Sequence, residues 1–431
     1  MQRKLISDLI EWKNKTHRKP LMLMGARQVG KTWLMKEFGK KEFKKTAYVT
    51  FFNNNRVKNV FETDYDIERI LLNINAETKI SVTPGDTLII LDEIQECPKA
   101  IESLKYFCED APEYYVIAAG SLLGVSIHQN ISFPVGKVDE LNLYPLSFEE
   151  FLLAAGEETL ASILEKKQFN YMVDFKDKYL HWLKNFFYVG GMPEVVSLFF
   201  ETKDYIQVRK LQNTILDQYR RDFGKHSKEE FQTRIEQVWN SIPAQLSKEN
   251  KKYFFGQIKK GSRMKDFELA IQWLCNAGLV HKVNRVSKPG VPLKAYEEIE
   301  AFKLFLLDVG LVSAMCNLNS QTIIDGDKAF VEFKGALTEN YVLQEIKANS
   351  NNSVFYYSND DSTFELDFLL DSENGPVPIE VKAQENLRAK SFKNYCEKFK
   401  PTVAIRTSTA DYREESWMKN IPLYAIGKAL S

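Results

Sequence analysis

One eight-residue string constrains the fold of this chain more than any other feature. Residues 25–32 read Gly-Ala-Arg-Gln-Val-Gly-Lys-Thr, directly after the apolar segment 20–24, and the last two of them open the helical pattern KTWLMKEF. The string matches GxxxxGK[ST], in which glycines let backbone N–H groups and a helix N-terminus face phosphates. It therefore predicts a strand, a phosphate-binding loop and a helix, in that order.

Individual residues of this loop receive specific roles from the pattern. Lys31 is expected to contact the β- and γ-phosphates of a nucleotide, and Thr32 to hold Mg²⁺. A hydroxyl at Ser121, after the apolar run 114–119, could sense the γ-phosphate, with a plain Gly-Ser turn as the alternative. The complete nucleotide-binding set that we predict is Gly25, Ala26, Arg27, Gln28, Val29, Gly30, Lys31, Thr32, Trp33 and Ser121.

A second apolar strand ends in two carboxylates. Asp92 follows four aliphatic residues in TLIILDE at 87–93, and a lone carboxylate buried there is costly unless a cation compensates its charge. Asp92 is therefore predicted to complete the magnesium site with Thr32. Glu93 could orient or deprotonate an attacking water, the task that distinguishes a hydrolase from a nucleotide holder. ATP and Mg²⁺ are thus the predicted cofactors, and a surface Asp-Glu pair is the alternative.

Length and periodicity predict several modules along the 431 residues. Residues 1–150 alternate near-continuous apolar runs with helical stretches, which is typical of an α/β domain with a parallel sheet and helices on both faces. Residues 151–225 have helical periodicity and are interpreted as a lid or linker. Residues 226–320 predict three helices and a hairpin of strands 280–287 and 292–298, a winged-helix pattern, and residues 325–431 a smaller α/β module.

Composition excludes several classes of protein. No apolar run approaches the roughly 18 to 20 residues that span a bilayer, so no membrane association is expected. The five cysteines are scattered and lack a CxxC pair, which argues against a disulfide framework or a zinc knuckle and favours a reducing cytoplasm. The 58 basic side chains balance 58 acidic ones, so any affinity for nucleic acid requires local segregation of charge.

Such segregation occurs between residues 248 and 294. This segment holds 11 Lys and Arg against three acidic residues. Arg263 and Lys265 lie near the start of a predicted helix, and Lys282 and Arg285 lie in the predicted wing, so DNA contact through helix and wing is electrostatically sensible. The alternative is a solvated basic face on a domain that docks on its own ATPase, and a protein partner or self-association is also possible.

The tail carries a pattern of acidic residues on predicted strands. In VPIEVK, Glu380 and Lys382 share a face opposite the aliphatic residues, and in FELDFLL, Asp367 lies opposite the apolar set. If these strands pair, Asp367 comes beside Glu380, and Glu339 on a preceding helix completes Glu…Asp…Glu-x-Lys. This resembles the PD-(D/E)xK nucleases, in which carboxylates hold Mg²⁺ or Mn²⁺ and the lysine assists the chemistry. Solvated strand faces carrying the same residues are the alternative.

Longer segments resemble a known family. GARQVGKTWLMKEF, TLIILDEIQECP, AAGSLLGV, LNLYPLSFEEF, YVGGMPEVV, RMKDFELAIQWLCNAGLV and LTENYVLQEI are similar to the AAA-type P-loop ATPases of bacteria and archaea that carry a C-terminal domain of unknown function. The resemblance implies ATP binding and hydrolysis, a winged-helix-like segment and a restriction-endonuclease-like tail. Lys137 stands where the family usually has Arg. Like Arg27, Lys137 could neutralise phosphate charge or be an ordinary surface cation.

Two functional hypotheses therefore stand side by side. In the first, ATP hydrolysis controls DNA binding or processing, with Asp367, Glu380 and Lys382 as catalytic residues of the tail and Glu339 as a further metal ligand. In the second, the protein is a nucleotide-controlled switch or binding module whose nuclease-like tail is catalytically silent. Both hypotheses require the ATP site, with Lys31 and Glu93 as its catalytic residues.

Overall fold

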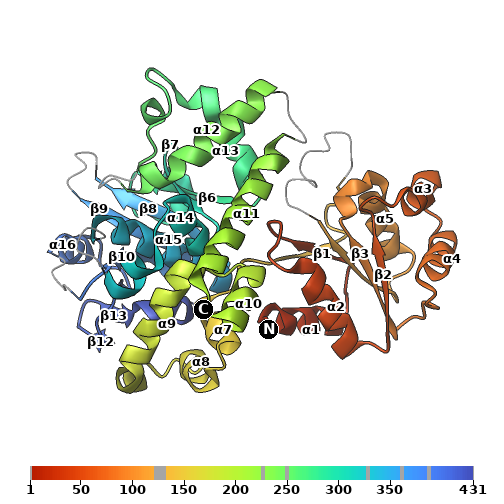
Figure 1. Cartoon of the computed structure of the whole chain (residues 1–431), viewed down its shortest axis with the longest axis horizontal. Helices are drawn as coiled ribbons and strands as arrows, with labels where there is room; N and C mark the ends of the chain where they lie inside the picture. Colours follow the sequence, from red (N-terminus) through yellow and green to blue (C-terminus); the bar gives the residue numbers. More distant parts are fainter. Residues whose placement is uncertain are drawn as a thin grey trace. The chain divides into compact units, whose positions relative to one another are not determined.

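The computed structural model divides the chain into two compact units, each with its own sheet (Figure 1). It describes residues 2–120, 133–224, 229–247, 252–326, 331–359, 364–385 and 390–430. The N-terminal unit comprises residues 2–144 with residues 276–278, and the C-terminal unit comprises residues 145–275 and 279–431. The boundary near residue 145 lies close to the predicted end of the first module.

The N-terminal unit is built on a five-stranded sheet whose strands are all parallel, as the sequence predicts. The strand order is β2-β3-β4-β1-β5, so the strand before the phosphate-binding loop lies between β4 and β5. This arrangement is the P-loop NTPase fold. The strands are β1 (Leu21–Met24), β2 (Lys45–Thr50), β3 (Thr87–Asp92), β4 (Tyr115–Ala119) and β5 (Asp139–Asn142).

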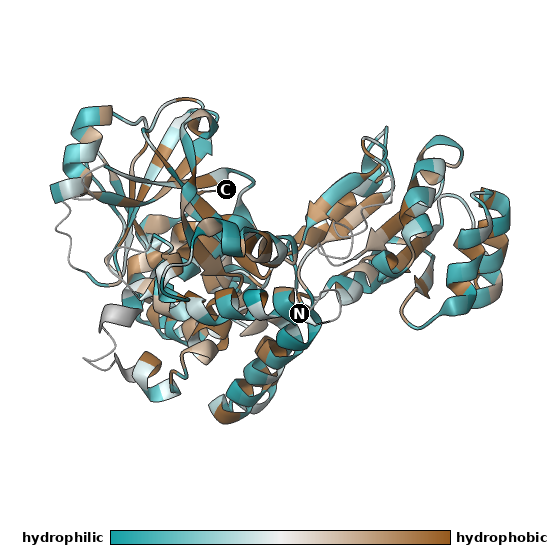
Figure 2. Cartoon of the chain, turned by 90° about the horizontal axis from the view of Figure 1, so that it is seen from above, coloured by the Kyte–Doolittle hydropathy of each residue, from teal (hydrophilic) through white to brown (hydrophobic). Residues whose placement is uncertain are grey.

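Helices cover both faces of this sheet because its central strands are apolar on both sides (Figure 2). One face packs Met22, Ile89 and Leu91 into a single core with residues of α3, α4 and α5. On the other face, α2 contributes buried apolar side chains, and Phe38 of α2 lies against Trp12 of α1. The helices are α1 (Leu5–Asn14), α2 (Lys31–Glu42), α3 (Asn55–Thr63), α4 (Ile67–Thr78) and α5 (Pro98–Glu109).

The C-terminal unit contains an eight-stranded mixed sheet with the order β12-β13-β11-β10-β9-β8-β6-β7. The predicted hairpin exists, but the prediction for its second strand is wrong: residues Leu293–Tyr296 form a short 3₁₀ helix, and the strand begins at Glu297. The strands are β6 (Val280–Val286), β7 (Glu297–Leu306), β8 (Ser353–Ser358), β9 (Glu365–Ser372), β10 (Gly375–Val381), β11 (Ile405–Ser408), β12 (Arg413–Glu414) and β13 (Lys419–Pro422).

The hairpin is continuous with the strands of the tail, since β6 pairs in parallel with β8. The predicted module boundary between residues 320 and 325 therefore falls within one sheet. Helices precede and cover this sheet, and helical periodicity predicts those between residues 151 and 225. They are α7 (Phe148–Ala154), α8 (Glu158–Glu165), α9 (Lys176–Val189), α10 (Pro193–Thr202), α11 (Tyr205–Phe223), α12 (Glu229–Leu246), α13 (Met264–Asn276), α14 (Val309–Met315), α15 (Val331–Asn349), α16 (Lys390–Phe399) and α17 (Ile426–Ala429).

A buried carboxylate fixes the glycine turn between α9 and α10. Asp308 accepts the backbone N–H of Gly191 at 2.6 Å and that of Leu311 at 3.0 Å, and it is fully buried. A Cβ at Gly190 would overlap the Asp308 carboxylate, which explains the glycine. Burial raises the pKa of Asp308 to about 6, although these hydrogen bonds oppose the shift. The turn thus packs onto the start of α14.

The cysteines and the lengths and polarity of the helices are two further features of the structure. All five cysteines are free thiols, and Cys97 and Cys396 are buried. Among the residues that the structure describes, every helix is too short or too polar to span a lipid bilayer.

Candidate functional site

The phosphate-binding loop follows β1, and α2 begins at Lys31, as the motif predicts. Two glycines have backbone conformations that L-residues rarely adopt, with φ of +154° at Gly25 and +95° at Gly30. A Cβ at Gly25 would also overlap the carbonyl oxygen of Leu143. The glycines are therefore required by the path of the loop itself, before any ligand binds.

The Lys31 side chain folds back onto this loop. Its Nζ donates hydrogen bonds to the carbonyl oxygens of Gly25 and Ala26, both at 2.8 Å. Burial lowers the pKa of Lys31 to about 8; the carboxylates of Glu93 and Asp92 oppose this shift, and Arg27 adds to it. The ammonium thus has two backbone carbonyl partners within the loop.

This pKa gives a pH-dependent prediction for nucleotide binding. A phosphate chain restores the pKa of Lys31 toward its ordinary value, because negative charge favours the ammonium. At pH 9 most of the free protein carries a neutral Lys31, so binding of ATP should take up close to one proton, whereas at pH 7 uptake should be near zero. Calorimetry in two buffers with different ionisation enthalpies measures this uptake.

The control for this experiment is Lys31→Arg, which stays charged and should show no uptake at pH 9. Binding enthalpies of the wild type that agree between the two buffers at pH 9 would contradict the prediction.

The predicted magnesium residues are in direct contact. The Thr32 hydroxyl donates to Asp92 Oδ2 at 2.7 Å, and Asp92 is only 3% exposed. Tyr48, which the sequence analysis missed, donates its hydroxyl to the same oxygen at 3.0 Å. Burial, and then the Asp92 carboxylate, raises the pKa of Tyr48 to about 12, so the phenol stays protonated. Asp92 therefore presents its carboxylate in an orientation that two hydroxyl groups hold.

Glu93 has a special backbone conformation at the end of β3. Its φ of +54° is rare for a residue with a side chain, and such strain of about 1–3 kcal/mol is typical of functional sites. The Gln95 side chain donates to Glu93 Oε2 at 2.5 Å and so restrains the carboxylate. Glu93 is thus held beside Asp92, and Gln95 is a second residue that the sequence analysis did not single out.

Arg3, near the start of the chain, supports the phosphate-binding loop. Its guanidinium donates to the carbonyl oxygen of Val29 at 3.0 Å and to that of Tyr144 at 2.6 Å, and Arg3 is 7% exposed. It therefore ties the loop to the segment after β5. No local pattern in the sequence marks Arg3, because it precedes the loop by more than 20 residues.

Two other predicted residues have different outcomes. Lys137 precedes the amino end of β5, whereas the loop follows the carboxyl end of the parallel strand β1, so Lys137 lies at the opposite edge of the sheet. There it forms an ion pair with Glu109 at 2.7 Å, as an ordinary surface cation. Ser121 lies outside the described residues.

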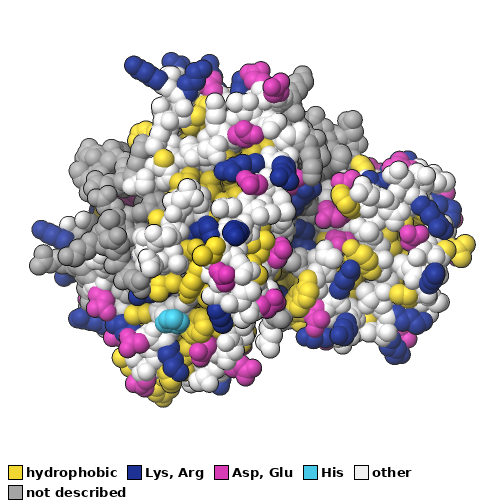
Figure 3. Space-filling model, in the orientation of Figure 1, with side chains coloured by type: hydrophobic (Ala, Val, Ile, Leu, Met, Phe, Trp, Pro, Cys, Tyr) yellow, Lys and Arg dark blue, Asp and Glu magenta, His cyan; other side chains and the backbone are white. Residues whose placement is uncertain are grey.

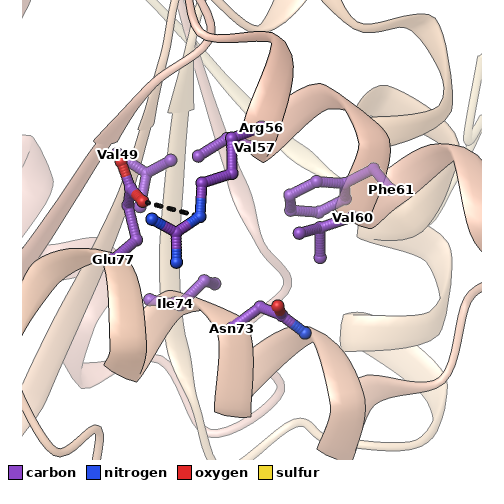
Figure 4. Close-up of a pocket in the computed structure, with 8 residues that line it drawn as sticks. All are labelled: Val49, Arg56, Val57, Val60, Phe61, Asn73, Ile74 and Glu77. Atoms are coloured by element: carbon purple, nitrogen blue, oxygen red, sulfur yellow. Dashed lines mark ion pairs between the residues drawn. The ribbon is translucent and has the colours of Figure 1, made fainter.

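A separate cavity of the N-terminal unit lies between β2, α3 and α4 (Figure 4). Its volume of about 10 Å³ is room for a single water molecule at most. An ion pair of Arg56 and Glu77 at 3.7 Å lies beside it (Figure 4). The cavity is a packing defect between helices rather than a binding site for a nucleotide.

In the C-terminal unit, the two acidic strands pair, which is the condition for Asp367 to lie beside Glu380. β9 and β10 are antiparallel with Ile379 opposite Phe368, so the next pair in this register is Glu380 and Asp367. Asp367 Oδ2 accepts the backbone N–H of Val381 at 2.7 Å, and Lys382 Nζ lies 2.6 Å from Glu380 Oε1. Burial raises the pKa of Glu380, and Lys382 opposes this shift.

Lys303, which no sequence pattern marks, lies beside further acidic residues of this unit. Lys303 of β7 is fully buried, and its Nζ lies 2.5 Å from Glu365 Oε1 and 4.0 Å from Glu339 Oε2. Burial lowers the pKa of Lys303, and the nearby carboxylates, chiefly Glu365 and Glu339, raise it by more. Within the part of the chain that the structure describes, no three His, Cys, Asp or Glu side chains gather closely enough to hold a metal ion.

The basic segment divides into exposed and engaged residues. Arg263 and Lys265 are exposed at the start of α13. Arg285 instead forms an ion pair with Glu298 at 2.5 Å, and Lys282 lies over the ring of Phe302. Over α12 and α13, Lys and Arg side chains are interspersed with Asp and Glu (Figure 3). Only part of the predicted DNA-binding face is therefore open to a partner, and residues 248–251 lie outside the described ranges.

Three family models match successive parts of the chain. Residues 17–152 match the AAA domain, residues 180–322 match a domain of unknown function (DUF8612), and residues 334–426 match another (DUF4143). The second match runs across the predicted boundary between residues 225 and 226. No curated protein matches the chain.

Solved structures that show some similarity to this chain include the following three proteins. The Walker-type ATPase of Pyrococcus abyssi is 14% identical, with 73% of this chain and 95% of that chain covered and a TM-score of 0.46. The Orc1 protein of Aeropyrum pernix in complex with DNA is 12% identical, with 73% and 91% covered and a TM-score of 0.27. AMPPCP-bound DnaA from Aquifex aeolicus is 13% identical, with 62% and 85% covered and a TM-score of 0.26.

TM-scores this low do not establish a common fold for the whole chain. The assignment rests instead on the parallel sheet, the loop geometry and the matched family model of the N-terminal unit. Residues 17–152 therefore form a P-loop NTPase domain that matches the AAA domain model, and later residues match two domain models whose function is unknown.

Proposed function

We propose that this protein binds ATP with Mg²⁺ at the loop 25–32 and hydrolyses it. The observation that carries the proposal is the hydrogen bond of 2.7 Å between the Thr32 hydroxyl and Asp92 Oδ2. It brings together the two side chains that a nucleotide-bound magnesium ion requires, at the start of the helix whose N-terminus faces the phosphates. Lys31 lies at the same helix start, and Glu93 follows Asp92.

The residues present fit a magnesium ion. Mg²⁺ prefers hard oxygen ligands and keeps several waters, and a hydroxyl and a carboxylate are ligands of this kind. When bound, the ion would supply positive charge to the phosphate oxygens. Thr32 would hold it directly, and Asp92 directly or through a water. Tyr48 fixes the orientation of Asp92 through its hydrogen bond of 3.0 Å.

Hydrolysis needs a group that orients and deprotonates water, and Glu93 is our candidate for this role. Its carboxylate is restrained by Gln95, and its left-handed backbone conformation directs it from the end of β3. Lys31 stabilises negative charge that develops on the γ-phosphate. Together these residues bind the phosphates, position water and accept its proton, which is the minimal set for an ATP hydrolase.

The test is steady-state release of phosphate from ATP by the full chain, with Mg²⁺ or with EDTA, and with or without double-stranded DNA. We expect release that depends on Mg²⁺. Absence of release that depends on Mg²⁺ would overturn the proposal of hydrolysis.

We also propose DNA binding through the exposed side chains Arg263 and Lys265. The affinity for DNA should therefore fall steeply as the salt concentration rises.

A matched pair of variants tests the DNA proposal. Arg263→Ala with Lys265→Ala should weaken DNA binding and reduce its salt slope by about two. The control is Lys40→Ala with Lys41→Ala, which removes the same charge from exposed positions of the N-terminal unit. Equal effects of both pairs, or no DNA binding at low salt, would leave the alternative in which the basic face contacts protein.

The second candidate function is the nucleotide-controlled switch with a catalytically silent tail. One observation favours it over nucleic-acid cleavage by Asp367, Glu380 and Lys382. The carboxylate cluster already contains the buried ammonium of Lys303, which is a poor neighbour for a catalytic metal ion. A nuclease-like topology without cleavage is common enough that fold by itself does not decide the activity.

A further inference from the structure

Lys303 is the most completely buried charged side chain among those near the acidic cluster. It lies on β7, has no exposed surface, and its Nζ is 2.5 Å from Glu365 Oε1 and 4.0 Å from Glu339 Oε2. The ammonium also lies 4.8 Å from the centre of the Tyr356 ring. A lysine is buried in this way only when negative charge nearby offsets its lost hydration, which costs several kcal/mol. Its position is therefore determined by the carboxylates.

The other carboxylates of the cluster have partners of their own. Glu380 is 8% exposed and forms an ion pair with Lys382 at 2.6 Å. Asp367, which lies opposite Glu380 in the register of β9 and β10, accepts the Val381 N–H at 2.7 Å. Two ammonium groups thus provide two positive charges to this cluster, the same charge that one divalent ion would provide.

A divalent ion does not fit among these residues as they are arranged. Its ligand oxygens must lie at about 2.0–2.6 Å, and an ion on a Glu365 oxygen would then face the ammonium already bound there. Repulsion between a divalent ion and an ammonium at such short range exceeds what one additional ligand returns. Among the described side chains, moreover, no three potential ligands form a group around one point. A metal ion on Glu365 and the buried ammonium of Lys303 are therefore mutually exclusive.

We propose that the Lys303 ammonium is the permanent counter-ion of the Glu339 and Glu365 carboxylates in the place of a divalent metal ion. The C-terminal unit consequently binds neither Mg²⁺ nor Mn²⁺ at this cluster and has no metal-dependent cleavage there. Lys303 instead connects β7, from the segment before residue 320, with α15 and β9 of the tail. This proposal rests on the second candidate function, the switch with a catalytically silent tail, and explains why the tail is silent. It does not depend on ATP hydrolysis.

The experiment measures Mn²⁺ binding to the full chain by electron paramagnetic resonance without nucleotide. All proteins carry Asp92→Asn, so that the ATP site contributes nothing and a failure of ATP hydrolysis cannot affect the result. The parent should show no Mn²⁺ site that Asp367→Asn removes. Lys303→Met keeps the length of the side chain and removes its charge, and it should gain a Mn²⁺ site that Asp367→Asn removes and that binds roughly tenfold or more tightly than any residual binding to the parent.

Lys382→Met is the matched control, because it removes the same charge from the more exposed lysine and leaves Lys303 in place. It should gain no site. If Lys303→Met is unfolded without metal, Mn²⁺ should restore its cooperative melting. The proposal is overturned if the parent binds Mn²⁺ through Asp367, if Lys303→Met neither gains a site nor is refolded by Mn²⁺, or if Lys382→Met gains the site equally.

Discussion

Lys31→Ala is expected to reduce ATP turnover by about 10²–10³-fold or more, and to weaken ATP binding. The variant removes the ammonium that we propose to face the β- and γ-phosphates, and no other lysine lies within the loop. This ammonium donates hydrogen bonds to the carbonyl oxygens of Gly25 and Ala26, and burial lowers its pKa to about 8. Removing it should therefore cost function rather than stability. Phosphate release and ATP titration measure both effects.

The control for this variant is Lys40→Ala, at an exposed position of the same helix, which should keep the turnover of the wild type. Thermal melting of both variants shows whether the fold is intact. Normal turnover in a folded Lys31→Ala protein would remove the assignment of the loop as the ATP site.

Glu93→Gln should separate binding from chemistry. The amide keeps the size of the side chain but cannot accept a proton from water, so turnover should fall by about 10²–10³-fold. Affinity for ATP with Mg²⁺ should stay close to that of the wild type, because Thr32, Asp92 and Lys31 remain in place. The protein should then accumulate with ATP bound, which filter binding of labelled ATP detects.

Glu96→Gln is the matched control, since it makes the same chemical change in the adjacent 3₁₀ helix, at a residue paired with Lys58 at 3.2 Å. A partly exposed ion pair of this kind contributes little to stability, so this variant should resemble the wild type. Hydrolysis by Glu93→Gln at the normal rate would mean that another group activates the water.

The two sites of the chain illustrate different uses of carboxylates at strand ends. At the proposed ATP site, Asp92 is held by the hydroxyl groups of Thr32 and Tyr48, which leaves its charge available to a cation. In the tail, Glu365 and Glu380 are each paired with a lysine ammonium. Similar acidic residues at strand ends therefore differ in their ability to bind a metal ion. The difference depends on whether a lysine ammonium already neutralises the carboxylate.

The sequence by itself determined those features that depend on neighbours along the chain or on a recurrent pair of motifs. The strand, loop and helix around residues 25–32 follow from glycine conformations and from helix geometry over a few residues, and the contact of Thr32 with Asp92 follows from the recurrent pairing of these two motifs. Alternation of period two likewise predicted that Asp367 and Glu380 would meet if their strands paired.

The contribution of distant residues was decided only by the tertiary structure. Arg3, Tyr48 and Lys303 reach their partners from segments 26 to 141 residues away along the chain, through contacts that depend on strand order and on helix packing. Period-two patterns show which face a side chain occupies but not which strand lies next to it. The hairpin of β6 and β7 joins the tail through β8 for the same reason, and so a lysine outside the acidic motif became part of its charge balance.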